Sequence, residues 1–266
     1  MSKFKALLRK DWFLSKKHLF LPIWITAGFY VLILITMLIG YLKGGLQLNW
    51  SDFNISDVAP VYAISYIANL SMMALPAFLG IIVTIILTQS ALNEDVRRNS
   101  ELFHRSQPVS IWLSTLSKYV TGIAGNWVIL FIITLFNFLV VNIILAAVGQ
   151  FVLYVAFSGM IQAFIGFMKV TLVIGSLCYF CSAVFKDKAF LLGLSILLGV
   201  QFLFFIINIL LGWNLPLPLT YLKDLLGHSN IMKIESGVTQ NEIIHLINRN
   251  WQELILSWKT LVQIIF

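Results

Sequence analysis

Residues 119–148 read YVTGIAGNWVILFIITLFNFLVVNIILAAV and contain no Asp, Glu, Lys, Arg or His. At 1.5 Å per residue, a helix of about 20 apolar residues crosses a hydrocarbon core about 30 Å thick. The stretch lacks the alternation of apolar and polar residues that is typical of barrel strands. Because lipid offers no hydrogen bonds to the backbone, the stretch predicts a membrane-spanning α-helix.

The same pattern recurs along the chain, which is 59% hydrophobic and only 11% charged, against about 25% charged residues in a soluble domain. We predict complete spans at 19–42, 66–92, 119–148, a stretch ending at 184, and 189–213. Residues 254–266 are apolar but too short to cross. We predict an incomplete sixth span here, with five spans and an interfacial tail as the alternative. The expected fold class is all-α, a polytopic membrane protein with residues 1–266 as one transmembrane domain.

The start of the fourth span is not marked by a charge. Residues 151–168 are apolar with four interruptions, which are Ser158, Gly159, Gln162 and Gly166. We predict a separate interfacial helix here, in preference to one very long helix. Lys169 would then extend its amine to the outer surface. The alternative is a lysine that lines a substrate path, since a mid-span lysine costs about 2.5–3.5 kcal/mol and is retained for a purpose.

Orientation follows from the basic residues. Twelve of the 18 Lys and Arg residues lie in the N-terminal arm, the 93–118 loop and the turn at 186–188. Basic residues near span ends are retained in the cytoplasm, so we predict a cytoplasmic N-terminus and an outer connection at 214–253. In the arm, residues 1–18, apolar side chains recur at helical spacing among lysines and arginines. This pattern predicts an amphipathic helix on the inner membrane surface.

Two further patterns lie outside the charged loop. Asn126 and Asn137 are 11 residues apart and therefore share one helix face. We interpret them as packing hydrogen bonds between helices, with contact to a substrate path as the alternative. In the outer connection, Thr239 and Glu242 form a capping box before an amphipathic stretch, which predicts a helix that rests on the outer leaflet or closes a path from above.

The 93–110 stretch reads NEDVRRNSELFHRSQPVS. It resembles the cytoplasmic loop of type-2 ABC exporter permeases, in which a charged pair precedes a Glu-Leu helix, a Pro-Val-Ser turn and a lysine that opens the third span. Ile111 departs from the pattern, because many members have an arginine there. The resemblance assigns Glu94 with Arg97 or Arg98 to the pair, Glu101, Leu102 and Phe103 to the coupling helix, Pro108 to the turn, and Lys118 to the lysine.

The resemblance implies a six-span permease pattern and a function. The chain would be the transmembrane subunit of a bacterial ATP-driven exporter in the plasma membrane, forming the translocation path. Its expected partners are ABC ATPase subunits, a second copy or a related permease, and membrane lipid, but no nucleic acid. ATP and Mg would be held by the partner ATPase, and this chain would bind no cofactor and would not itself be an enzyme.

Other classes of function remain open. A lipid-modifying membrane enzyme would need converging acidic side chains, for which Asp52 and Asp57 are the close outer pair. A non-catalytic anchoring subunit would need no site at all. The sequence contains no phosphate-binding G-x-x-x-x-G-K-[ST] loop and no H-E-x-x-H motif, and its four histidines lie in separate segments. We therefore expect no catalytic residue and no metal site, and we interpret Cys178 and Cys181 as packing residues.

Overall fold

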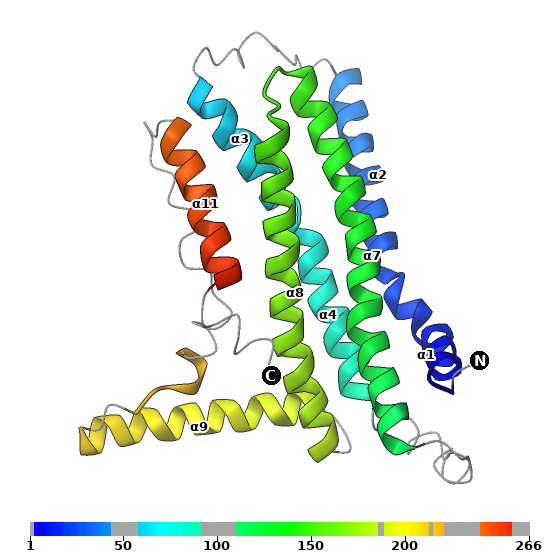
Figure 1. The fold of residues 1–266 in the computed structure, drawn as a ribbon, viewed down its shortest axis with the longest axis vertical. Helices are drawn as coiled ribbons and strands as arrows, with labels where there is room; N and C mark the ends of the chain where they lie inside the picture. The colour runs from blue at the N-terminus through cyan, green and yellow to red at the C-terminus, as the bar shows by residue number, and fades with distance from the viewer. Residues whose placement is uncertain are drawn as a thin grey trace.

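The computed structural model describes residues 3–43, 58–91, 110–185, 189–212, 215–220 and 240–256. Within these ranges the chain forms long α-helices (Figure 1). They are α1 (Lys3–Leu19), α2 (Leu21–Leu42), α3 (Val58–Ser71), α4 (Ala74–Ser90), α7 (Ile111–Ala147), α8 (Leu153–Val184), α9 (Ala189–Leu211) and α11 (Gln240–Leu256). The all-α class predicted from the sequence is confirmed.

Five helical stretches are long and apolar enough to cross a membrane. They are Lys3–Gly40, Val61–Gln89, Trp112–Ala147, Leu153–Val184 and Ala189–Leu211. They match the five complete spans expected from the sequence, and the protein is therefore a multi-pass membrane protein. The expected sixth span falls mostly on residues 257–266, outside the described part of the chain, while Leu254 lies within the last turn of α11.

Two proline residues accompany interruptions in the spans. α1 and α2 are separated at Phe20, two residues before Pro22, and Figure 1 shows α1 turning away from the line of α2. The second predicted span is likewise two helices, because α3 ends at Ser71 and α4 begins at Ala74, just before Pro76. Proline lacks a backbone N–H, so Pro76 cannot donate to the carbonyl four residues earlier, that of Met72.

The helix α8 lies at the centre of the bundle, where it contacts α3, α4, α7, α9 and α11. The largest buried cluster lies between α4, α7, α8 and the end of α1. Its buried members are Leu19, Met73, Val83, Leu87, Ile129, Leu130, Ile133 and Phe167. Glycine permits the closest helix contacts: a Cβ on Gly159 would lie 2.9 Å from the backbone oxygen of Tyr66. Small residues of this kind let membrane helices approach without a large apolar side chain between them.

The prediction of a separate interfacial helix at 151–168 is wrong. α8 runs unbroken over 32 residues from Leu153 to Val184, so the four interruptions lie on one helix. Its length is about 48 Å and that of the 37-residue α7 is about 55 Å, against about 30 Å for a hydrocarbon core. Both helices therefore extend beyond the lipid core, and the polar residues of α8 reflect its contact with another helix rather than a break.

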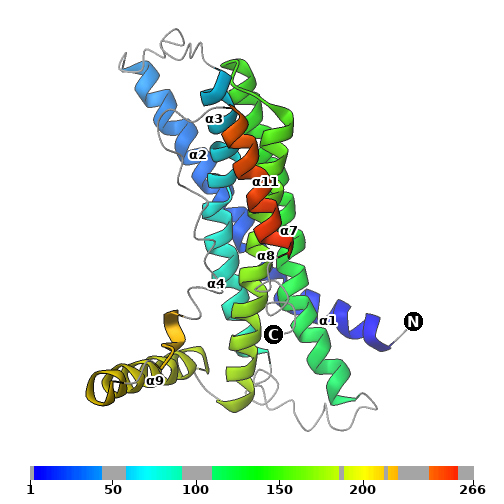
Figure 2. The same ribbon diagram turned by 60° about the vertical axis from the view of Figure 1, so that its left-hand side comes forward.

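The helix α9 lies crosswise to α7 and α8 in both views (Figures 1 and 2). Of its residues only Ala189 is buried. Its beginning packs closely on α8, since a Cβ on Gly193 would overlap the Sγ of Cys181. The rest of α9 is apolar on every side, and lipid can solvate any of its faces. Because no buried contact holds it against the other helices, packing within this chain does not fix its direction.

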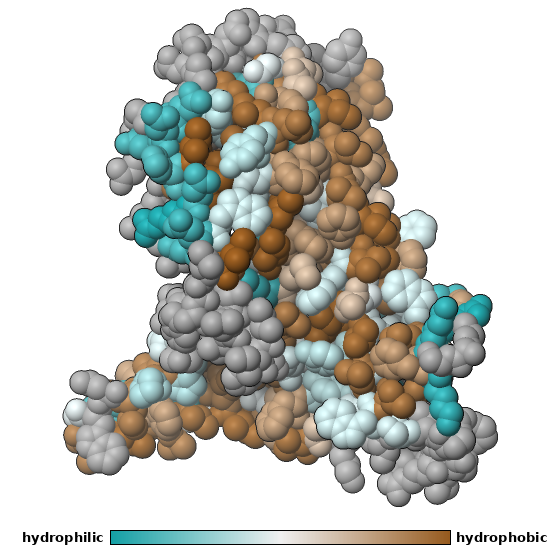
Figure 3. Space-filling model, viewed as in Figure 1, coloured by the Kyte–Doolittle hydropathy of each residue, from teal (hydrophilic) through white to brown (hydrophobic). Residues whose placement is uncertain are grey.

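The surface divides by polarity. In Figure 3 hydrophilic side chains gather over α11 and near α1, and hydrophobic side chains cover the bundle between them. Exposed apolar side chains lie on α2, α7 and α9, among them Leu34, Ile143 and Phe202. In water such a surface would be costly, whereas in lipid it is solvated, which agrees with the membrane assignment.

Candidate functional site

The helices on either side of the 92–109 stretch are tied together by a lysine. Lys118, in the second turn of α7, donates from its Nζ to the backbone oxygen of Ala91 at 2.8 Å. Ala91 is the C-cap of α4, and the last carbonyls of a helix lack partners in the helix and carry its negative dipole end. The ammonium group of Lys118 therefore both fills an open carbonyl and complements the charge there.

The N-terminal helix joins the same place. Ser117 donates from its hydroxyl to the Oδ2 of Asp11 at 2.6 Å, and Asp11 is buried although it is charged. Next to it, Gly125 lets the Trp12 ring pack close, since a Cβ there would lie 3.1 Å from the ring. A buried carboxylate is stable only when it is hydrogen-bonded, so Asp11 fixes α1 onto α7.

We call Asp11, Ala91, Ser117 and Lys118 the loop junction. It brings three helices, α1, α4 and α7, to the two ends of the stretch that resembles a coupling loop. A displacement applied to that stretch would therefore act on all three helices together. The helix predicted at 1–18 is present as α1, while its place on the inner membrane surface stays a prediction. Figure 2 shows α1 projecting from the bundle at the end where α7 begins. The sequence identified Lys118 but not its partner, nor Asp11.

The coupling residues themselves lie outside the described residues. They are Glu94, Arg97, Arg98, Glu101, Leu102, Phe103 and Pro108. The acidic pair of the enzyme alternative, Asp52 and Asp57, and the capping residue Thr239 also fall in ranges that are not described. The helix expected after Thr239 is present as α11, which begins at Gln240.

Asn126 and Asn137 both face the interior from α7, as their shared helix face predicted, and both have partners within the chain. Asn126 is fully buried and donates from Nδ2 to Gly80 O and Thr84 Oγ1, each at 2.8 Å. Asn137 accepts a hydrogen bond from the Tyr30 hydroxyl at 2.8 Å. These contacts favour the packing interpretation over the substrate path.

The second contact of Asn137 satisfies a backbone carbonyl at the break between α3 and α4. Its Nδ2 donates to the backbone oxygen of Met72 at 3.4 Å. That carbonyl is the one that Pro76 cannot satisfy, because proline has no N–H. A side chain of α7 thus supplies the hydrogen bond that the proline withholds, and it is needed because lipid cannot supply it.

Lys169 does not extend to the outer surface, so that prediction is wrong. It is 7% exposed, and its Nζ donates to the backbone oxygen of Leu254, near the end of α11. The cause is the continuity of α8: positions 158, 162 and 169 fall within about 40° of one another around a helix, and α11 covers that face. The three proposed path residues therefore do not converge, because Asn126 and Asn137 face α4 and α2 while Lys169 faces α11.

The polar groups on this face of α8 form a chain of hydrogen bonds with α3 and α11. The Tyr66 hydroxyl donates to Gln162 Oε1 at 2.5 Å and accepts from Asn250 Nδ2 at 2.9 Å. Gln162 Nε2 donates to Ile247 O at 3.1 Å, and Trp251 Nε1 donates to Ser158 Oγ at 2.7 Å. We call Tyr66, Ser158, Gln162, Asn250 and Trp251 the α11 cluster. Its α8 members, Ser158 and Gln162, are two of the four residues that seemed to interrupt a span.

The helical spacing of residues in two separate segments of the sequence points to this cluster. Ser158, Gln162 and Lys169 lie at helical spacing on α8, and the buried residues of α11 also recur at helical spacing. These are Ile243, Ile247, Asn250 and Leu254. An amphipathic helix whose buried stripe includes one polar residue, Asn250, and a span with a polar stripe predict contact with each other, although sequence alone does not say which pairs meet.

Chemistry that needs a metal would require several ligands together. In the described ranges no three His, Cys, Asp or Glu side chains come together to hold a metal ion. Comparisons with protein-family models, with curated proteins and with solved structures gave no match.

Proposed function

We propose that this chain is the membrane-spanning subunit of an ATP-driven exporter in the bacterial plasma membrane. The observation that carries the proposal is the loop junction. Lys118 connects the end of α4 to the beginning of α7, and Asp11 connects α1 to the same turn of α7. The intervening stretch is the one whose sequence resembles a coupling loop, and the helices it joins are long and apolar enough to cross a membrane.

In this proposal the energy comes from separate ABC ATPase subunits, which hold ATP and Mg. Leu102 and Phe103 enter an apolar groove of the ATPase, because apolar anchors at the centre of an interface carry most of its binding energy. Glu94, Arg97, Arg98 and Glu101 lie at the rim, where charges set orientation. When the ATPases close, the loop moves as a unit, and the loop junction transmits the movement to α1, α4 and α7.

The same proposal sets the orientation and the assembly. The N-terminus and the 93–118 loop face the cytoplasm, where the ATPase is, and the 214–253 connection faces outward. Single cysteines at Ser100 and Asn230, in a chain without Cys178 and Cys181, should then react with an impermeant reagent from opposite sides. Two chains, or this chain and a related permease, together enclose the translocation path.

Co-purification tests the proposal. The tagged chain, extracted from its native membrane in mild detergent, should bring with it an ABC ATPase in a near-equimolar ratio. The matched control is a second polytopic membrane protein of the same cell, carrying the same tag and present in similar amount. An ATPase that is retained equally by the control, or is missing from the sample, would contradict the proposed function.

A further inference from the structure

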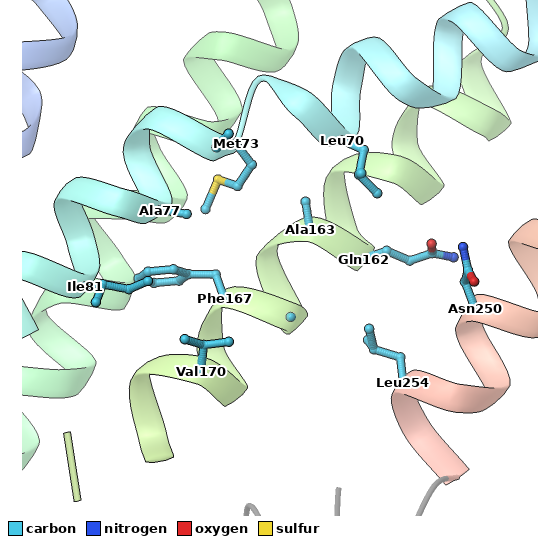
Figure 4. A pocket seen from close by; sticks show the side chains of 12 residues that line it. Leu70, Met73, Ala77, Ile81, Gln162, Ala163, Phe167, Val170, Asn250 and Leu254 are labelled. Carbon is cyan, nitrogen blue, oxygen red and sulfur yellow. The ribbon is translucent and has the colours of Figure 1, made fainter. Parts of the chain in front are cut away.

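A cavity of about 250 Å³ lies between α3, α4, α8 and α11, next to the α11 cluster. Its walls are mostly apolar, and Figure 4 shows these side chains converging on it from α3, α4, α8 and α11. The apolar lining consists of Leu70, Met73, Ala74, Ala77, Ile81, Ala163, Gly166, Phe167, Val170 and Leu254. Gln162 and Asn250 point toward one another at one end and supply its polar groups. The cavity therefore has an apolar body and a polar end.

The size of the cavity limits what it can hold. It has the volume of about eight water molecules, at about 30 Å³ each. An apolar cavity of about 150 Å³ in a protein interior stays dry and binds small apolar molecules, whereas pockets for drug-sized ligands start near 300 Å³. The cavity is half open, and its volume suits part of an alkyl chain with one small polar group.

The polar end offers a hydrogen-bond acceptor. Asn250 is 5% exposed, and its Nδ2 donates to the Tyr66 hydroxyl. Its Oδ1 accepts no hydrogen bond from any residue in the described ranges. This oxygen borders the cavity and keeps its lone pairs open, so it can accept a hydrogen bond from a ligand with an O–H or N–H at this end. The amide of Gln162 is already bonded on both sides.

The charge of the ligand follows from the same lining. Among the described residues that border the cavity none is charged, and the amine of Lys169 is directed to the backbone oxygen of Leu254 instead. A carboxylate or phosphate placed here would lose its hydration without gaining a counter-charge. A neutral head group with hydroxyl or amide donors avoids this cost.

We propose that this cavity binds a neutral single-chain amphiphile, with the alkyl chain between α4 and α8 and an O–H or N–H donor at Asn250 Oδ1. A monoacylglycerol has this chemistry. The proposal goes beyond the exporter function, because binding requires neither an ATPase nor transport. If the amphiphile does not bind, the co-purification result still stands. If no ATPase co-purifies, the binding site still stands.

The test uses the full chain in phosphatidylcholine nanodiscs and a monodecanoylglycerol probe that carries a diazirine in its acyl chain. After illumination, mass spectrometry should locate the adducts on peptides of α4, α8 and α11, with saturation as the probe concentration rises. Adducts that do not saturate, or that spread over the exposed faces of α2 and α9, would show adsorption at the lipid surface only and would overturn the proposal.

Two variants that fill the cavity make the test specific. Gly166→Leu places a side chain where a Cβ would meet no atom within 4 Å, and Ala77→Leu fills the cavity from α4. Each should weaken saturable labelling by at least about tenfold, the effect of losing burial of roughly two methylene groups. Gly199→Leu is the matched control, because a Cβ there also meets nothing within 4 Å but lies on exposed α9. Equal labelling of all three variants would contradict the proposed site.

The hydrogen bond between the head group and Asn250 Oδ1 is tested by one change in the probe and one change in the protein. In the wild type the dihydroxyl probe should bind about tenfold more tightly than its dimethyl ether, a typical difference for one buried hydrogen bond. Asn250→Leu should abolish this preference while retaining the binding of the ether. Thermal unfolding of the variant in detergent shows whether the chain remains folded. An unchanged preference in folded Asn250→Leu would show that Asn250 does not contact the head group.

Discussion

Lys118 Nζ lies 2.8 Å from the backbone oxygen of Ala91, although 26 residues separate them in the sequence. The contact closes the stretch between α4 and α7 into a loop with fixed ends. Because Ser117, the preceding residue, holds buried Asp11, the same turn of α7 also fixes α1.

Removing the amine should open the loop junction. Lys118→Met should lower the free energy of unfolding by about 1.5–3 kcal/mol, the usual cost of losing a hydrogen bond to a charged group. Lys118→Arg retains the donors and the charge and should lose much less. Urea unfolding of the purified protein in mixed micelles, followed by tryptophan fluorescence, would measure both. If Lys118→Met is as stable as the wild type, the contact does not hold the helices together.

The contact of Asn137 with Met72 can be tested against the proline that makes it necessary. Asn137→Leu leaves the Met72 carbonyl without a donor and should destabilise the protein by about 1–3 kcal/mol. Pro76→Ala supplies a backbone N–H that can reach the same carbonyl in a continuous helix. In the double variant the asparagine should therefore matter less, and a double-mutant cycle should give a coupling energy between the two positions. Simple additivity would contradict this explanation of the break.

Two glycines of α8 should respond in opposite ways to the same substitution. A Cβ at position 159 would lie 2.9 Å from the backbone oxygen of Tyr66, and one at 166 would meet nothing within 4 Å. Gly159→Ala should therefore push α8 from α3 and cost about 1–3 kcal/mol. Gly166→Ala should be neutral or stabilising, because alanine favours helix by about 1 kcal/mol over glycine. Apparent melting temperatures in one detergent would compare them, and equal shifts would show that α3 and α8 do not approach this closely.

The spans were predictable from the sequence because lipid imposes one rule on every segment. Backbone groups need internal partners and side chains need apolar character, so length and composition suffice to locate α2 and α7. The amphipathic α1 was predictable for a related reason, since its basic and apolar faces match an interface. Neither rule depends on which helix lies next to which.

The two wrong predictions, for residues 151–168 and for Lys169, concern polar residues whose role depends on which helix packs against them. Gln162 and Lys169 appeared to interrupt or end a span because their partners lie far away in the sequence. Gln162 bonds Tyr66 and Ile247, and Lys169 bonds Leu254. A polar residue inside an apolar segment is interpreted as the end of a span unless the helix that packs against it is known. The contact of Asn137 with the Met72 carbonyl could not be predicted for the same reason. Pro76 shows that this carbonyl lacks its helical donor, but nothing in the sequence of α7 shows which residue replaces the donor.

The central claim is that an ATPase drives this chain through its 93–118 loop, and one measurement tests it most directly. ATP hydrolysis by the co-purified ATPase is compared in proteoliposomes for the wild type, for Leu102→Asp with Phe103→Asp, and for Arg105→Ala. Two carboxylates in an apolar groove should abolish binding and stimulation, since buried anchors are worth about 2 kcal/mol or more each, whereas the rim change should have little effect. Normal stimulation by the well-expressed double variant would contradict the account.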